Sequence, residues 1–340
     1  MMRPTVRPTA TGTAVRVVAL TVAVLLGAAA CATPPPVAQP EPAPAVAPAV
    51  MSPEQNDAVL ANLGTVLAAA DTAMDPSLLA ARVSGPALIM RTAEYAHASA
   101  PGGGRAPTAL PTAAQAEIVP QTTSWPRAQL VVTEQPDDLQ APRILVLQQA
   151  TARDQYALWG WARLFPGVSM PKTAEATTGS PVLAPSTDAL LVRPDEVLAA
   201  YGLALAGTAD PNAVAFGEDP FRTGVIAARQ ALATGVQEIG TAAETYTPDP
   251  DGPLTVLGTV DGGAIVVGRM TTVSTVTITL SGAKLTLSPY ETALSGVAEA
   301  ASSLARTYTD VLVFYVPPAG ASTPVQLLGA EAVLTAVGAQ

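Results

Sequence analysis

Reactive side chains are scarce in this 340-residue chain, which has one cysteine, Cys31, and one histidine, His97. A single cysteine excludes a disulfide within the chain and a cluster of thiolate metal ligands. A single histidine likewise excludes a metal site built from several imidazoles. We therefore expect neither a bound metal nor another cofactor.

Basic residues are also sparse. Three of the 17 lie in the first 30 positions, so the rest of the chain carries 14 basic and 27 acidic residues. The basic residues beyond position 30 are scattered singly, and the two lysines are Lys172 and Lys284. Because phosphate binding needs clustered Lys and Arg, the sequence argues against a nucleic-acid partner.

Motifs for catalysis are missing as well. There is no Gly-x-Ser-x-Gly segment of the kind that positions a hydrolase nucleophile. His97 lies three residues after Glu94, which is a spacing at which a carboxylate can orient an imidazole as a base. The alternative, which we favour, is a histidine at the end of a helix, where the helix dipole stabilises positive charge. We expect a protein that is not an enzyme.

Apolar residues and proline are plentiful by contrast. The chain has 33 prolines, and 49% of its residues are apolar. That apolar content is enough to bury a sizeable core, so a chain that is disordered throughout is excluded. The length is typical of two domains of roughly 150 residues each.

The first 30 residues have the pattern of an export signal. Arg3, Arg7 and Arg16 are followed by an uncharged run of 14 residues over positions 17–30, rich in Val, Leu and Ala. That run is shorter than the roughly 20 residues that a transmembrane helix needs. We therefore expect a signal peptide over residues 1–30.

Small residues stand directly before Cys31, in a pattern that resembles the lipobox of bacterial lipoproteins. Ala28 stands where that pattern has Leu, although Leu25 and Leu26 lie just upstream. The resemblance implies a lipid on Cys31 that anchors the exported protein to the outer face of the cytoplasmic membrane. Ordinary cleavage, which releases a secreted chain, is the alternative. Lysine is scarce in this chain, whereas Ala, Arg, Pro and Val are abundant. Together with the lipobox, this composition resembles that of actinobacterial envelope proteins.

Residues 31–50 are predicted to form a tether. Seven prolines lie among residues 32–50. Proline fixes φ and removes a backbone donor, which favours an extended spacer. We expect the folded part to begin near Met51.

Proline-containing helix starts open each half of the folded part. Ser52, Pro53 and Gln55 combine a capping hydroxyl, a proline at the first helical position and the glutamine of a capping box. Further helix starts are predicted at residues 75–76, 85–86, 194–196 and 219–220.

Strand-like segments follow each group of helices. An Asp-Gly-Gly turn at residues 261–263 predicts a hairpin between 254–260 and 264–270. A further helix is predicted from Ser288 through about Leu304. The other predicted strands cover residues 129–134, 143–149, 156–164, 273–280, 284–287, 310–316 and 325–337.

This order predicts an α+β fold with two tandem domains, over residues 51–188 and 189–340. Each domain is expected to pack N-terminal helices on a curved antiparallel sheet. The element order resembles the cone-shaped nuclear transport factor 2-like (cystatin-like) fold. Residues 314–317, Phe-Tyr-Val-Pro, are similar to a segment near the end of actinobacterial lipoproteins. The resemblance implies no particular activity.

Tyr156, Trp159 and Trp161 are the candidate ligand-binding residues. The two tryptophans are two residues apart on a predicted strand, which places them on one face, where they would line a pocket for a sugar, lipid or peptide. The alternative, which we favour, is a stripe of the hydrophobic core that faces the helices.

The sequence thus predicts a non-catalytic, lipid-anchored protein of the cell envelope that binds a partner protein or supports an assembly. The alternative is a lipoprotein that binds a small molecule or lipid in the open end of a cone.

Overall fold

The computed structural model describes residues 46–102, 104–136, 140–210, 214–249 and 252–340. The part from Val46 to Gln340 is one compact unit. Within the described residues, no helix is both long and apolar enough to cross a membrane. The predicted signal peptide, Cys31 and the tether up to residue 45 lie outside this description. The end of the predicted tether contacts the folded unit, because Ala49 forms a β-bridge with Gln121.

The helices of the first half start where the sequence predicts. In α2 (Pro53–Ala73), Ser52 and Gln55 exchange hydrogen bonds in the predicted capping box. A 3-10 turn, η1 (Pro76–Leu79), and α3 (Gly85–Ala98) follow.

The strands of the first half follow these helices, and three of them confirm the predicted strands to within two residues. Those three are β3 (Arg127–Thr133), β4 (Arg143–Gln149) and β5 (Ala157–Leu164). The sequence did not indicate β1 (Ala114–Ile118), β2 (Pro120–Gln121) or β6 (Ser180–Pro181).

The second half repeats the order of helices and then strands. The helices α4 and α5 begin at the predicted prolines, and the predicted hairpin of β8 and β9 is present. The elements are α4 (Pro194–Ala206), α5 (Pro220–Val236), β7 (Gly240–Pro248), β8 (Thr255–Gly258), β9 (Ala264–Ile278), β10 (Leu285–Thr286), α6 (Pro289–Ser295), β11 (Glu299–Ala300), β12 (Ser303–Val316) and β13 (Gln326–Ala339).

Two predictions about these elements were wrong, and the strands β7 and β11 were missed. Residues 273–280 are not a separate strand, because β9 runs without a break from residue 264 to 278. The helix predicted from Ser288 does not reach Leu304. It ends at Ser295, where Gly296 adopts a left-handed φ of 78°.

One antiparallel sheet of nine strands joins the two halves. Its order is β1-β3-β4-β5-β13-β12-β9-β7, with β8 paired to β9. The halves meet where Gly329 and Ala330 of β13 pair with Leu164 and Arg163 of β5. The α+β class is therefore confirmed, whereas two tandem domains with separate sheets are not shown.

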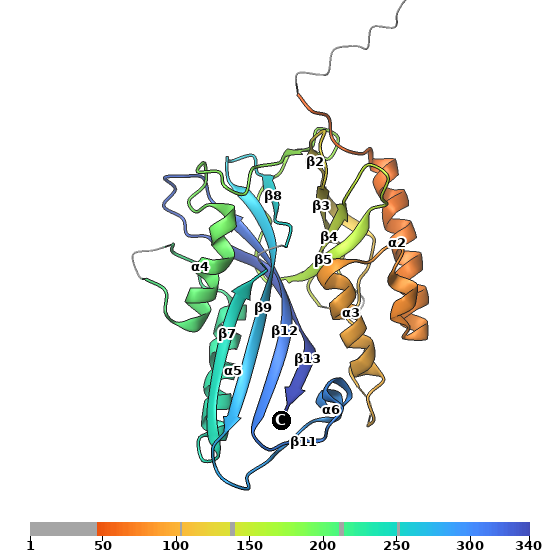
Figure 1. Cartoon of the computed structure of the whole chain (residues 1–340). Coiled ribbons are helices and arrows are strands. Elements are labelled where there is room, and N and C mark those ends of the chain that lie inside the picture. Colours follow the sequence, from red (N-terminus) through yellow and green to blue (C-terminus); the bar gives the residue numbers. More distant parts are fainter. Residues whose placement is uncertain (1–45, 103, 137–139, 211–213, 250–251) are drawn as a thin grey trace, which may run out of the picture. The chain divides into compact units, whose positions relative to one another are not determined.

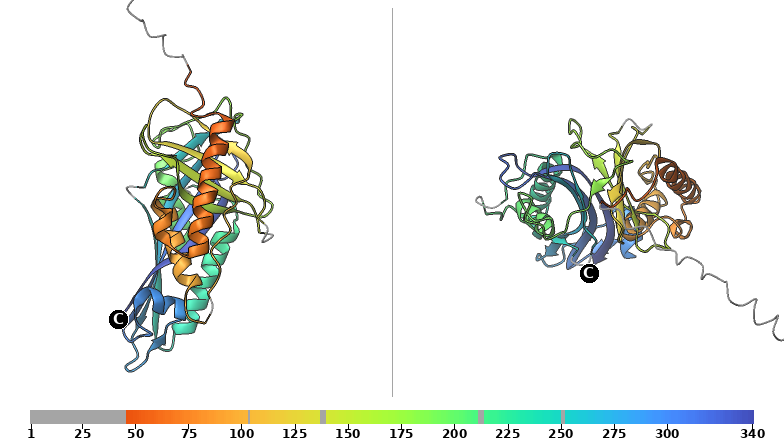
Figure 2. Two further views of the ribbon diagram at one scale, coloured as in Figure 1. Left: turned by 90° about the vertical axis from the view of Figure 1, so that its right-hand side faces the viewer. Right: turned by 90° about the horizontal axis from the view of Figure 1, so that it is seen from above.

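Strand β12 explains why the halves share a sheet. Val311 and Val313 lie in the core beneath α2 and α3, whereas Leu312 and Phe314 lie in the core beneath α4. Successive side chains of a strand point to opposite faces, so this segment is buried on both sides. Helices α2 and α3 accordingly lie on one side of the long strands, and α4 and α5 lie on the other (Figures 1 and 2).

Candidate functional site

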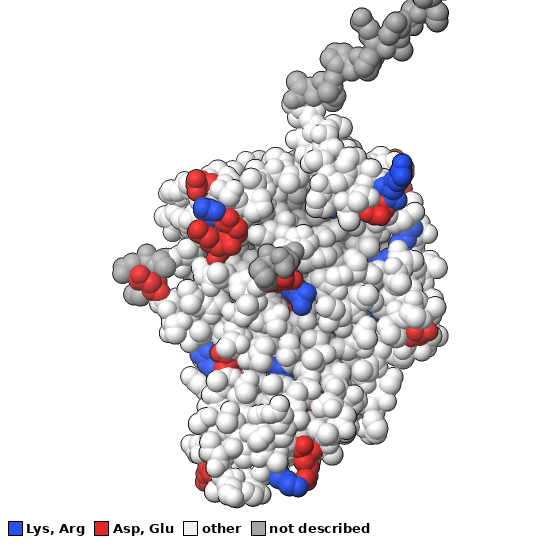
Figure 3. All heavy atoms as spheres, in the orientation of Figure 1, with Lys and Arg blue, Asp and Glu red and all other residues white. Residues whose placement is uncertain are grey.

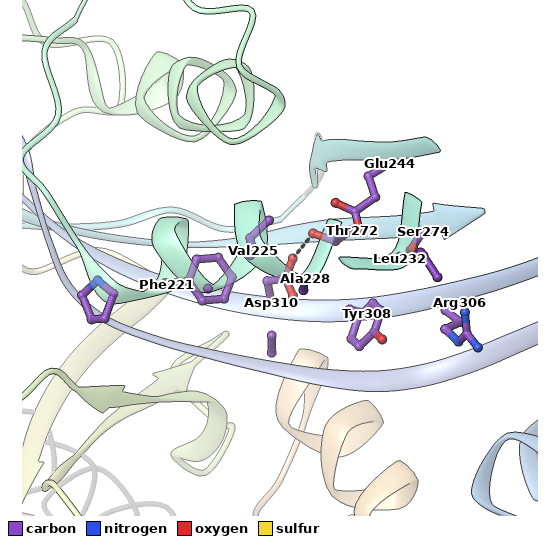
Figure 4. Close-up of a pocket in the computed structure, with 13 residues that line it drawn as sticks. Phe221, Val225, Ala228, Leu232, Glu244, Thr272, Ser274, Arg306, Tyr308 and Asp310 are labelled. Carbon is purple, nitrogen blue, oxygen red and sulfur yellow. Dashed lines mark hydrogen bonds between the residues drawn. The ribbon is translucent and has the colours of Figure 1, made fainter. Parts of the chain in front are cut away.

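A cavity of about 580 Å³ lies between α5 and the sheet (Figure 4). This volume falls in the range of roughly 300–1,000 Å³ that is usual for small-molecule sites. The helix contributes Pro220, Phe221, Gly224, Val225, Ala228 and Leu232, and the sheet contributes Glu244, Thr272, Ser274, Arg306, Tyr308, Asp310 and Ala332.

The helical wall is apolar because of its sequence spacing. Phe221, Val225 and Leu232 are separated by four and seven residues, which places them on one face of α5. At Gly224 the wall carries no side chain, and a Cβ there would meet no atom within 4 Å. The helix therefore leaves open space over the sheet.

Helix α5 is held at its start, its middle and its end. At the start, Asp219 accepts a hydrogen bond from the Tyr201 hydroxyl at 2.9 Å. In the middle, Arg229 donates to the Leu205 carbonyl at 2.6 Å. Val236 near the end is the one residue of the helix that is fully buried. These contacts fix α5 beside α4 without closing the space beneath its apolar face.

The floor of the cavity is a polar strip across three strands. Ser274 of β9 lies opposite Glu244 of β7 on one side and Arg306 of β12 on the other. Two residues earlier on β9, Thr272 lies opposite Tyr308. Side chains directly opposite each other in a sheet share a face, so this register gathers these residues beneath α5.

Asp310 lies at the inner wall of the cavity, two residues beyond Tyr308, and is 1% exposed. Its Oδ2 accepts a hydrogen bond from the Thr272 hydroxyl at 2.5 Å (Figure 4). Its buried Oδ1 has no hydrogen-bond partner among the described residues. Burial raises the pKa of Asp310 to about 7, and the bond from Thr272 opposes that effect. The carboxyl group therefore titrates near neutral pH.

The other charged groups of the floor already have partners. Arg306 Nε donates to Glu291 at 2.5 Å, and Glu244 accepts from the Tyr246 hydroxyl at 2.5 Å. Of the lining residues that the structure describes, only Asp310 has a buried polar side-chain atom without a partner. Asp310 is therefore the lining group of this site whose hydrogen bonding is incomplete among the described residues.

Tyr156, Trp159 and Trp161 lie in the hydrophobic core, at 8%, 5% and 0% exposure. Trp159 packs so closely on Gly85 that a Cβ at that glycine would lie 2.7 Å from the indole. The ring of Trp161 lies 6.0 Å from the guanidinium carbon of Arg91. None of the three lines the cavity beneath α5. The structure thus places them in a core stripe, which was the alternative interpretation.

His97 lies at the end of α3, against the ring of Tyr290 at 4.2 Å between centroids. Glu94, which the spacing offered as its partner, accepts hydrogen bonds from Arg91 and Thr108 instead. A second cavity of about 180 Å³ lies beside the histidine. This placement matches the interpretation of His97 as a helix-end residue.

The sequence makes two predictions about bound groups: a lipid on Cys31, and no metal or other cofactor. Cys31, the predicted lipidation residue, lies outside the described residues. Within the described ranges, no three His, Cys, Asp or Glu side chains are grouped to hold a metal. That the protein works without a metal or cofactor stays a prediction.

The described surface is sparsely charged. On the face in Figure 3, the charged side chains lie singly or in small groups separated by broad uncharged areas. Phosphate binding needs clustered basic groups, and this face shows no such cluster among its described residues. The absence of a nucleic-acid partner nevertheless stays a prediction.

The residues of the cavity floor were not predicted as site residues, although the sequence contains a signal for them. Arg306, Tyr308 and Asp310 occupy every second position of β12, and the residues that follow Asp310 are apolar. Such an alternation indicates that polar groups share one face of a sheet. It does not indicate that a helix covers that face and leaves space beneath it.

Comparison with known proteins identifies one family that matches the chain. No curated protein and no solved structure matches it. The family described as a domain of unknown function (DUF8094) matches residues 46–339, which is nearly the whole of the folded unit. The chain belongs to this DUF8094 family.

Proposed function

We propose that this protein is a non-catalytic, exported lipoprotein that binds a small molecule or lipid in the cavity beneath α5. One observation carries the proposal: an apolar helix wall and a polar floor enclose about 580 Å³, and the floor includes a buried carboxyl oxygen without a partner. Apolar lining with a few fixed polar groups is the usual make-up of a ligand site.

The envelope location rests on the sequence. Basic residues, an apolar run and small residues before Cys31 favour export and attachment of a lipid at that cysteine. The proline-rich segment after Cys31 would hold the folded unit away from the outer face of the cytoplasmic membrane. An actinobacterial source belongs to the same proposal.

A binding role fits the chain better than catalysis does. The one histidine lies outside the cavity beneath α5, against Tyr290. The polar groups of the floor come from the middle of long strands and are largely paired with each other or with neighbours. Such a floor orients a ligand without supplying an activated nucleophile.

We also propose that the two halves, residues 51–188 and 189–340, descend from one α+β module of the nuclear transport factor 2-like kind. Support comes from their common order of proline-started helices followed by antiparallel strands. In this proposal, the two sheets merged where β5 now pairs with β13.

Native mass spectrometry of the full-length protein, extracted from its own host membranes in mild detergent, tests the proposal. We expect a chain that starts at Cys31 with a diacylglyceryl mass and carries a bound small molecule. A bare chain would contradict the binding role. A co-purifying protein without a small molecule would favour a scaffold in its place.

Two variants of one helix provide the matched control. Gly224→Leu adds a side chain into the cavity, whereas Gly235→Leu adds the same side chain to α5 outside the cavity lining. We expect the bound molecule to be lost from the first variant and kept by the second. Retention by both variants would place the ligand elsewhere.

A further inference from the structure

The unpaired oxygen of Asp310 indicates what the cavity lacks. Buried polar groups in native proteins nearly always have a hydrogen-bond partner, and an unmade bond to a charged group is especially unfavourable. Asp310 Oδ1 is buried and has no donor among the described residues, although Thr272 satisfies the other oxygen at 2.5 Å. An occupant of the cavity that donates a hydrogen bond to this oxygen would complete its pairing.

The charges around the cavity favour a cationic donor. The lining contains two carboxyl groups, Glu244 and Asp310, and one guanidinium, that of Arg306. Arg306 is neutralised from outside the lining by Glu291, whose Oε1 lies 2.5 Å from its Nε. The remaining charge of the lining is negative once Asp310 is ionised. Hydrogen bonds from a charged donor to a carboxylate are roughly twice as strong as neutral ones.

The remaining walls favour hydrocarbon. Phe221, Val225 and Leu232 face the floor from α5 (Figure 4). Phe221 and Arg306 lie toward opposite ends of the residues drawn, and Asp310 lies between them (Figure 4). A ligand that matches both the carboxyl group and the apolar walls has a charged head and an apolar body.

Resting on the proposed binding function, we propose that the cavity takes a small apolar molecule with a protonated amine. The N–H groups of the amine donate to Oδ1 of Asp310, and its hydrocarbon lies against the apolar face of α5.

This pairing makes amine binding depend on pH. The residues that line the cavity with Asp310 come from five elements. They are Glu244 from β7, Thr272 and Ser274 from β9, Arg306 and Tyr308 from β12, Ala332 from β13, and apolar side chains from α5. Because burial holds the pKa of Asp310 near 7 in the free protein, part of the population is neutral at pH 6. Amine affinity should therefore rise between pH 6 and pH 8.

Three eight-carbon probes test the proposal by isothermal titration calorimetry at pH 8: 1-octylamine, 1-octanol and octanoate. The full chain with Cys31→Ser is used, because it cannot carry the proposed lipid. We expect octylamine to bind about tenfold more tightly than octanol, and octanoate to bind most weakly. Equal binding of octylamine and octanol, or a preference for octanoate, would overturn the inference and leave the proposed function intact. If no probe binds, octanol included, the proposed function itself fails.

Variants identify the carboxyl group responsible. Asp310→Asn should bind octylamine about tenfold more weakly while its octanol affinity stays within about twofold. Asp57→Asn removes the same charge from an exposed position on α2 and should retain the preference. If Asp310→Asn does not fold, Glu244→Gln serves instead, with an expected loss of about threefold. A preference for octylamine over octanol that is unchanged from the parent in the folded variant would overturn the assignment to that carboxyl group.

Discussion

Helices α3 and α5 cover opposite faces of the same sheet, but they pack very differently. Six of the 14 residues of α3 are buried, whereas α5 has one buried residue among 17. Consecutive residues of β12 show the same contrast, because Val311 enters the core beneath α3 and Asp310 lines the cavity beneath α5. The α3 side has more buried residues and contributes more stability, whereas the α5 side leaves the larger space, of about 580 Å³, that a ligand can fill.

Arg91 on the α3 side and Asp310 on the α5 side differ in how completely they are hydrogen-bonded. Arg91 is 1% exposed and donates hydrogen bonds to Asp71, to Glu94 and to the Thr108 carbonyl. Asp310 is equally buried, yet one of its oxygens has no partner among the described residues. Burial alone is therefore no sign of a site, whereas incomplete pairing beside a cavity is.

The largest expected effect on stability is on the α3 side of the sheet. Arg91→Met leaves Asp71 and Glu94 without their guanidinium partner, and breaking a buried pair in this way lowers the free energy of unfolding by about 3–5 kcal/mol. Arg193→Met, which removes an exposed pair with Asp195, is the control, with a much smaller expected loss because solvent screens the pair. Urea unfolding of the Cys31→Ser chain, followed by circular dichroism, measures both. Equal losses would remove the contrast between buried and exposed pairs.

A second pair of variants compares the packing of the two helices. Met90→Ala on α3 empties a fully buried position and should lower the free energy of unfolding by about 2–5 kcal/mol. Leu232→Ala on α5 removes a half-buried side chain that borders the cavity, with an expected loss of about 1 kcal/mol or less. The same urea titrations compare the two. A loss for Leu232→Ala as large as that for Met90→Ala would mean that α5 is as tightly packed as α3.

A third stability effect concerns the pH dependence of Asp310. Its pKa is about 7 in the folded protein and 3.8 as the ordinary value, so the folded state holds the proton more strongly. Stability from this group is therefore greatest at low pH and is lost as pH rises from about 4 to about 7. Asp310→Asn removes the charge, so it should be more stable than the parent at pH 8, by a difference that grows as pH rises from about 4 to about 7.

Urea unfolding at pH 5, 6, 7 and 8 follows this difference. Asp57→Asn, on the exposed face of α2, should keep the pH dependence of the parent. A constant difference between Asp310→Asn and the parent at all four pH values would show that Asp310 does not titrate in this range.

The sequence predicted much of the fold but little of the site. The helix starts at Ser52, Pro194 and Asp219 were predictable because caps and prolines act locally. The joining of the two halves was not predictable, because Gly329 and Leu164 are distant in the chain and their pairing depends on tertiary structure. The cavity was missed for the same reason. Trp159 was chosen as a binding residue because aromatic side chains suit both pockets and cores, and only packing distinguishes the two.

Hydrogen–deuterium exchange of the Cys31→Ser chain, with and without saturating 1-octylamine, tests the central claim most directly. Amides in α5 should exchange faster than those in α3 in the free protein, because few buried contacts hold α5 in place. Octylamine should then slow exchange in α5 and in the facing part of β12, and leave α3 unchanged. Equal exchange of the two helices, with no effect of the probe on α5, would contradict the claim that α5 covers a ligand site.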